Sequence, residues 1–162
     1  MEKRESIKNE LSELLQLVSF ELNGEEFGID ILLVQEIIRM IQITKVPNSP
    51  EFIEGVVNLR GRVIPVVDLR CKLGMPRKEH DNSTRIVVVD ILGRTTGFIV
   101  DAVNEVLRIP ASITEAPPTL VSGGINSEFI KSVGKLEDRL LILIDLEKIL
   151  THSEKAHLQE VS

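Results

Sequence analysis

Two aspartates have the right chemistry for general acid and base catalysis. Asp68 and Asp145 each follow a run of β-branched residues, so each carboxyl group would stand at the end of a predicted strand. Both close the same pattern, in Val67-Asp68-Leu69 and Ile144-Asp145-Leu146. Aspartate at such a position commonly caps the next turn through its side-chain oxygen. We therefore interpret both residues as structural rather than catalytic.

Metal binding and thiol chemistry are also disfavoured. The three histidines, His80, His152 and His157, lie in a linker and near the C-terminus, without the spacing of metal ligands. Cys71 is the single cysteine, which excludes an internal disulfide and a cysteine-based metal site. We expect Cys71 to be a buried thiol in a reducing compartment, and we expect neither a metal nor a cofactor.

Nucleotide and nucleophile motifs are incomplete. Gly134-Lys135 has Phe129 where a P-loop needs its first glycine, and no helix signature directly follows Gly123-Gly124. The sequence also contains no Gly-x-Ser-x-Gly elbow. These observations predict a protein that is not an enzyme.

The composition narrows the class of partner. Hydrophobic residues make up 43% of the chain, aromatic residues only 3%, and the net charge is −6. Nucleic acid binding usually needs basic surfaces or aromatic stacking platforms, so we expect none. The first ten residues are charged, and the longest apolar run, Leu140 to Ile144, is far too short to span a membrane. We expect a cytosolic protein without direct membrane insertion.

The elements around these residues are organised by a hairpin. Val56 to Arg60 and Val63 to Leu69 read as antiparallel strands around Gly61, which tolerates a positive φ that we do not expect of its arginine neighbours. Pro65 lacks an N–H, so it fits the return strand only at an edge or where the ladder is broken. The hairpin therefore offers a charged tip for holding a partner.

An internal repeat explains most of the chain. A shift of 69 residues superimposes Leu17, Gly24, Gly28, Val34, Glu36 and Arg39 on Ile86, Gly93, Gly97, Val103, Glu105 and Arg108. A shift of 77 superimposes Phe52, Ile53, Leu59, Arg62 and Asp68 on Phe129, Ile130, Leu136, Arg139 and Asp145. Small units this rich in turns usually close into barrels, so we predict a duplicated β fold with about five strands in each half.

The remaining elements follow from local signals. Ser6 to Leu15 has helical spacing, and Asn23-Gly24 predicts a turn between two strands. Asp30 can cap one helical turn, and Ser49-Pro50-Glu51 reads as the start of a short helix that Gly55 ends. Further strands are predicted at Arg85 to Ile91, Gly97 to Val100, Asn104 to Ile109 and Leu140 to Asp145, and short helices at Leu146 to Leu150 and Ser153 to Val161.

The repeat also helps to separate fold from function. Arg60-Gly61 at the first hairpin tip corresponds to Glu137-Asp138 in the second half, so the fold does not demand Arg60. A carboxylate and a guanidinium near apolar strands, as in Glu36 and Arg60, can orient a docking segment. The alternative, that both are ordinary surface charges, stays open, because Glu36 recurs as Glu105.

Three strings carry a resemblance to a known family. They are FGIDILLVQEI (Phe27 to Ile37), PEFIEGVVNLRGRVIPVVDLR (Pro50 to Arg70) and DRLLILIDLEKIL (Asp138 to Leu150), and they resemble the CheW family of bacterial chemotaxis coupling proteins. The resemblance covers 16–150, with approximate halves 16–76 and 84–150, an arm or short helix at 1–15 and a tail or helix at 151–162. It implies a mainly β fold of two intertwined five-stranded SH3-like barrels with short helices.

The resemblance also implies a function and a site. It implies a cytoplasmic adaptor, recruited to membrane-bound receptor arrays, that joins the cytoplasmic tips of chemoreceptors to the regulatory domain of the CheA histidine kinase. Family residues that contact the receptor match Val34, Glu36, Asn58 and Arg60 here. Gly55 and Gly61 match positions that affect coupling to receptor or kinase. Arg62 departs from the family, which has an apolar or small residue there.

Two alternatives remain open at this point. Domains of this family also occur fused to a receiver domain or at the end of the kinase, but the chain leaves no room for either, which favours a stand-alone adaptor. From another class, a small duplicated barrel could hold a small ligand or act as a hydrolase through Asp68 or Asp145. Binding to receptor and kinase would distinguish the adaptor from these alternatives.

Overall fold

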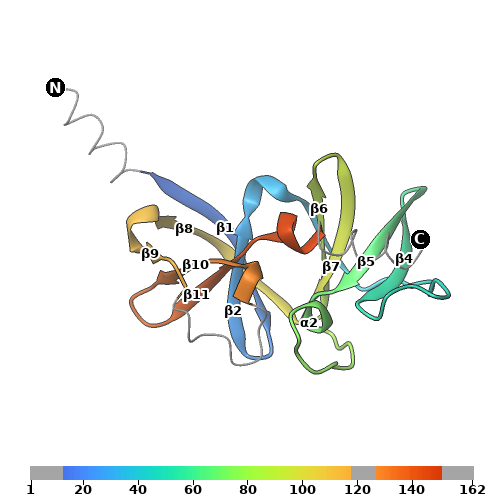
Figure 1. The fold of residues 1–162 in the computed structure, drawn as a ribbon. Helices are drawn as coiled ribbons and strands as arrows, with labels where there is room; N and C mark the ends of the chain where they lie inside the picture. Colours follow the sequence, from blue (N-terminus) through green and yellow to red (C-terminus); the bar gives the residue numbers. More distant parts are fainter. Residues whose placement is uncertain (1–12, 118–126, 151–162) are drawn as a thin grey trace.

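Two β-sheets make up the body of the molecule (Figure 1). The computed structural model describes residues 13–117 and 127–150. Sheet A has the strand order β8-β1-β2-β11-β10-β9, and sheet B the order β3-β6-β7-β5-β4. The strands of sheet A are β1 (Leu14–Leu22), β2 (Glu25–Asp30), β8 (Ala102–Pro110), β9 (Thr114–Glu115), β10 (Ile130–Lys135) and β11 (Leu140–Ile144).

Sheet B and the short helices complete the described chain. The strands of sheet B are β3 (Val34–Arg39), β4 (Ile53–Leu59), β5 (Arg62–Asp68), β6 (Arg85–Ile91) and β7 (Arg94–Val100). The helical turns are η1 (Ile31–Leu33), α2 (Leu69–Lys72), η2 (Ala111–Ile113), η3 (Ser127–Phe129) and a helix at 146–150. In the described part of the chain, no helix is both long enough and apolar enough to cross a membrane.

Each sheet takes strands from both halves of the repeat. The first hairpin, β1–β2, pairs with β8 and β11 of the second half, and β6–β7 pairs with β3 and β5 of the first. Two of these pairings between the halves are parallel: β2 with β11 and β7 with β5. The predicted mainly β fold of two intertwined subdomains is therefore confirmed. Sheet A has six strands rather than the predicted five, because the two-residue β9 pairs with β10.

A shared hydrophobic core lies between the sheets. Its buried members come from both, among them Phe20 and Phe27 of sheet A and Val67 and Phe98 of sheet B. The Phe20 and Phe27 rings stack with centroids 5.9 Å apart. Burial of such side chains stabilises the fold by about 1.5–3 kcal/mol each, so the two sheets stabilise one another.

Three hairpins end in the same two-residue turn. Asn23-Gly24, Arg60-Gly61 and Leu92-Gly93 all have positive φ at both positions, with φ of 54°, 53° and 54° at the first. A turn of this kind matches the twist of its flanking strands but needs two residues with positive φ. Our expectation that Arg60 would avoid this conformation is therefore wrong. For residues other than Gly, Asn or Asp it costs about 1–2 kcal/mol.

Local signals at two other places are overridden by strand pairing. Ser49-Pro50-Glu51 starts no helix; the Ile53 N–H donates to the Pro50 carbonyl in a single turn, and β4 then begins. Gly55 lies inside β4 rather than at a helix end. Leu14 and Leu15 belong to β1, where they pair with Pro110 and Ile109 of β8, so the predicted helix does not reach them. The rest of that prediction, and the helix at 153–161, lie outside the described residues.

Several expectations about single residues are confirmed. The Asp30 carboxylate accepts from the Leu32 N–H and caps η1. Pro65 pairs with Val56 of β4, but the pairing of β5 with β7 begins only at Val66, so β5 is an edge on that side at Pro65. The helix predicted at the end of the domain is present at 146–150.

Candidate functional site

Glu36 and Arg60 join the two edges of sheet B. Glu36 lies on β3 and Arg60 in the β4–β5 turn, and β3 and β4 are the outer strands of the sheet. Arg60 Nη1 donates to Glu36 Oε2 at 3.1 Å and to Oε1 at 3.4 Å, and Nη2 also contacts Oε2. The Arg60 side chain is 64% exposed and that of Glu36 30%. The guanidinium is thus held in place while most of its surface faces solvent.

Asn58 and Gly61 shape the turn that carries Arg60. The Gly61 N–H donates to Asn58 Oδ1 at 2.9 Å, so the Asn58 side chain stabilises the turn. Gly61 has a φ of 82°, and a Cβ added there would meet only open space. Gly61 is therefore required by the backbone conformation and not by packing.

Gly55 closes the barrel rather than forming the tip. It lies at a register shift of β4, with a φ of 152°, and a Cβ there would stand 2.3 Å from the Thr44 carbonyl oxygen. The neighbouring Val56 exchanges hydrogen bonds of 2.8 and 2.9 Å with Thr44. The segment after β3 can therefore pair with β4 at Thr44 only because residue 55 has no side chain.

Val34 contributes to the core as well as to the surface. It is half-buried, pairs with Val89 of β6 and packs against the shared core. The structure thus brings Val34, Glu36, Asn58, Arg60 and Gly61 to one end of sheet B and places Gly55 along its closing edge. Their contact with a partner stays a prediction.

Sheet A carries a different arrangement at the matching end. Arg139 Nε donates to Glu26 Oε2 at 2.7 Å, Nη1 to Asp138 Oδ1 at 2.9 Å and Nη2 to Glu105 Oε1 at 3.4 Å. Burial alone would raise the pKa of Glu26, but hydrogen bonds from Arg139 and Ser19 and the charge of Arg139 hold this pKa below its usual range. We had not singled out this cluster, although the repeat matches Arg139 with Arg62 and Glu105 with Glu36.

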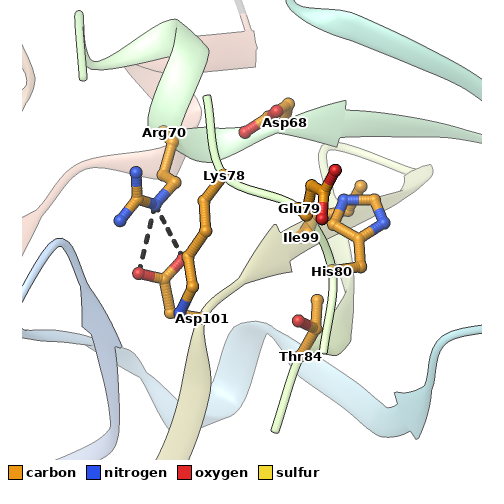
Figure 2. A pocket seen from close by; sticks show the side chains of 8 residues that line it. All are labelled: Asp68, Arg70, Lys78, Glu79, His80, Thr84, Ile99 and Asp101. Carbon is orange, nitrogen blue, oxygen red and sulfur yellow. Dashed lines mark hydrogen bonds and ion pairs between the residues drawn. The ribbon is translucent and has the colours of Figure 1, made fainter. Parts of the chain in front are cut away.

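A second polar centre connects the sheets (Figure 2). Arg70 Nε, at the start of α2, donates to both carboxylate oxygens of Asp101 at 2.8 and 3.1 Å. The N–H of Asn23, in the β1–β2 turn, donates to Asp101 Oδ2 at 2.9 Å. The Arg70 and Asp101 side chains are only 11% and 15% exposed. The group therefore fastens the first hairpin of sheet A to sheet B.

The pocket beside this centre is too small for a ligand. Its lining includes Asp68, Lys78, Glu79 and His80, which would suit proton transfer by type (Figure 2). It encloses about 10 Å³, however, which is the room of a single water molecule. This pocket therefore offers no room for a substrate.

The residues with catalytic chemistry have structural partners. Asp68 accepts from the Cys71 N–H and Asp145 from the Lys148 N–H, so both aspartates are caps as expected. Cys71 is half-buried rather than buried, and burial followed by the charge of Asp68 raises the pKa of its thiol. Within 13–117 and 127–150, no group of His, Cys, Asp and Glu side chains could hold a metal ion.

A larger groove lies on sheet A, away from most of the predicted residues. It encloses about 570 Å³ and runs between β1, η1 and β10, with Leu14, Leu32 and Lys131 in its lining. Among the described residues that line it, none is one of the six predicted site residues. Leu32 connects this groove to the end of sheet B, because η1 leads directly into β3.

Comparison with known proteins gives a consistent result. The family model described as CheW-like domain matches residues 16–154. The chain is 40% identical over 148 residues to the chemotaxis protein CheW of Klebsiella aerogenes, covering 91% of this chain and 88% of that protein. It is 36% identical to the protein of the same name from Helicobacter pylori, covering 85% and 82%. The solved structure of the scaffolding protein TtCheW from Thermoanaerobacter tengcongensis superimposes with a TM-score of 0.76 at 40% identity, covering 83% and 86%.

Proposed function

The chain belongs to the family of CheW-like domains, whose members are chemotaxis scaffolds and not enzymes, and from this premise we propose what it connects. It joins the cytoplasmic tips of transmembrane chemoreceptors to the regulatory domain of the CheA histidine kinase, in the cytoplasm and at receptor arrays. The receptor contacts Val34, Glu36, Asn58 and Arg60. Gly55 and Gly61 hold the hairpin that transmits the contact.

The exposed but anchored guanidinium of Arg60 supports this proposal most directly. Its pairing with Glu36 limits the conformations of a long side chain, so less conformational freedom is lost when a partner binds. A planar guanidinium also recognises carboxylates and carbonyl groups with defined geometry. The end of sheet B therefore offers an oriented contact without further rearrangement.

Tethering explains how such a protein works without bond-making. Two surfaces on one rigid body raise the effective concentration of the two partners for one another. If the two states of the receptor contact the end of sheet B differently, that difference in binding free energy reaches the kinase. Couplings of this kind are typically about 1–3 kcal/mol.

The test is Arg60→Glu, measured by calorimetry against a receptor cytoplasmic fragment and against the kinase regulatory domain. We expect receptor affinity to fall about tenfold or more, because a cation becomes an anion beside Glu36. Kinase affinity and Tm should stay near the parent values, because the side chain is largely exposed.

The matched control is Glu137→Lys, at the corresponding tip of sheet A. It changes the net charge by the same amount in the opposite direction. Because Glu137 lies in the other sheet, receptor affinity should not change. Receptor affinity equal to the parent in Arg60→Glu, or a collapse of its fold, would contradict the proposed site. Failure of the parent to co-sediment with receptor and kinase would contradict the proposed function.

A further inference from the structure

Two exposed leucines stand where the other copy of the repeat has its polar centre. The shift of 69 residues that matches the halves places Leu92 on Asn23 and Leu32 on Asp101. Asn23 and Asp101 are hydrogen-bonded and fasten the sheets together. Leu92 is 77% exposed and Leu32 87% exposed. Each pair takes one residue from each half; Asn23 and Asp101 are hydrogen-bonded to one another, whereas the matching Leu92 and Leu32 face solvent.

These leucines lie at the same end of sheet B as Arg60. Strands β5 and β7 run parallel, and Val66 pairs with Gly97, so the turns that precede them are side by side. Arg62 Nη2 donates to Thr95 Oγ1 at 3.0 Å across this register. Strand β3 begins opposite the end of β6, which brings η1 to the same place. Figure 1 shows the β4–β5 and β6–β7 hairpins pointing the same way.

The turn residues at this end violate a local preference. Asn is well suited to positive φ, and it occupies the turn whose backbone N–H is hydrogen-bonded to Asp101. Arg60 and Leu92 adopt the same conformation without that suitability. Leu92 gains little from burial in return, because most of its side chain faces solvent. Departures of this kind concentrate where a protein binds something.

The charges at this end define the partner. Arg62 and Arg94 are exposed. Arg94 directly follows the Leu92-Gly93 turn, and Arg62 lies beside this turn across the sheet, where its Nη2 donates to the neutral hydroxyl group of Thr95. Arg60 is matched by Glu36, and the nearby Asp90 carboxylate accepts from the Gln35 amide. A protein with net charge −6 therefore presents guanidinium groups beside two exposed leucines here. The complementary segment has apolar side chains next to carboxylates.

Resting on the proposed function, we infer that the receptor-binding surface extends from Arg60 across Arg62 to Leu92 and Leu32. It takes a segment of the receptor tip in which apolar side chains alternate with carboxylates. The leucines contribute the apolar contact, and Arg62 fixes the register of the carboxylates. The surface lies at the end of sheet B, which Leu32 reaches from η1, and leaves the Arg139 cluster at the end of sheet A out of the contact.

The deciding variant is Leu92→Asn, which introduces the residue found at the matching turn. Asn suits the positive φ of this position better than Leu, so Tm should equal or exceed that of the parent. Affinity for the receptor cytoplasmic fragment should nevertheless fall about fivefold or more, since an exposed apolar anchor is lost. Affinity for the kinase regulatory domain should not change.

Leu140→Asn is the matched control, because Leu140 is 61% exposed next to the turn of the β10–β11 hairpin. It should leave receptor affinity unchanged. Arg62→Gln tests the charge and should weaken receptor binding about threefold while reducing its dependence on salt.

Each outcome decides the inference. Parent-like receptor affinity in Leu92→Asn would overturn it while leaving the proposed function standing. Tighter binding in Arg62→Gln would overturn it as well, because the partner segment would then be basic. If the parent itself binds no receptor fragment, the proposed function fails first and this surface fails with it.

Discussion

Glu36 and Glu105 occupy matching positions in the two sheets, and each binds an arginine in a different setting. Glu36 holds Arg60, whose side chain is 64% exposed. Glu105 shares Arg139 with Glu26 and Asp138. The end of sheet A is therefore occupied by internal ion pairs, whereas the end of sheet B presents an oriented cation. The duplication supplied the fold twice, and the two copies differ in how many carboxylates hold the arginine at this end.

The closing edge of sheet B should be the most sensitive place in the comparison. Gly55→Ser introduces the residue that sheet A has at the matching position, Ser132. The new Cβ would meet the Thr44 carbonyl oxygen at 2.3 Å, so we expect a loss of about 3 kcal/mol or more in the free energy of unfolding. Urea denaturation followed by circular dichroism measures it.

The reverse change, Ser132→Gly, is the control for this prediction. Glycine in a strand costs about 0.5–1 kcal/mol, so the effect should be several times smaller. Equal effects of the two changes would show that the two closing edges do not differ in the way described.

A second comparison sets Glu26, which binds Arg139, against Glu36, which binds Arg60. Glu26→Gln should lower the free energy of unfolding by about 1–2 kcal/mol at neutral pH, because its side chain is only 12% exposed and accepts from Arg139 and Ser19. Glu36→Gln should cost less than about 0.5 kcal/mol, as expected of an exposed pair. Thermal unfolding of both variants and the parent checks the ranking.

The dependence on pH sharpens this test. The pKa of Glu26 is lowered in the fold from its usual value of 4.5, so the unfolded state binds the proton more readily. Its stabilisation is present above the unfolded pKa and is lost as pH falls through the folded pKa. Glu26→Gln and the parent should therefore converge in stability in acid. A difference that stays constant down to pH 2 would argue against the ion pair as the cause.

The two capping aspartates provide the smallest contrast. Asp68→Ala should cost about 1–2 kcal/mol and Asp145→Ala less, because Asp68 is 6% exposed and the Asp145 side chain is only half-buried. Asparagine at either position should recover most of the loss, since its amide oxygen also caps. If asparagine recovers nothing, the role of the carboxylate is not capping.

Local patterns in the sequence predicted what local physics determines. The turn at Asn23-Gly24 and the cap formed by Asp68 were predicted correctly, because each signal and its effect lie within a few residues. The backbone of Arg60 and the role of Gly55 were misjudged, since they depend on strand twist and on Thr44, which is distant in sequence. Residue patterns could not predict the exchange of hairpins between the sheets, because β1–β2 and β6–β7 are near copies that could pair with either half. The intertwined arrangement was predicted from the family resemblance. The residues that contact a partner were likewise named by resemblance.

The exchange of hairpins also determines when each sheet can form during synthesis of the chain. Sheet B lacks its central strands until β7 leaves the ribosome, and β2 of sheet A waits for β11, close to the end of the described chain. Contacts so distant along the chain make for slow folding. The nascent first half can form its β1–β2 and β4–β5 hairpins, but its two sheets stay incomplete, and in reach of chaperones, until nearly all of the second half has been translated.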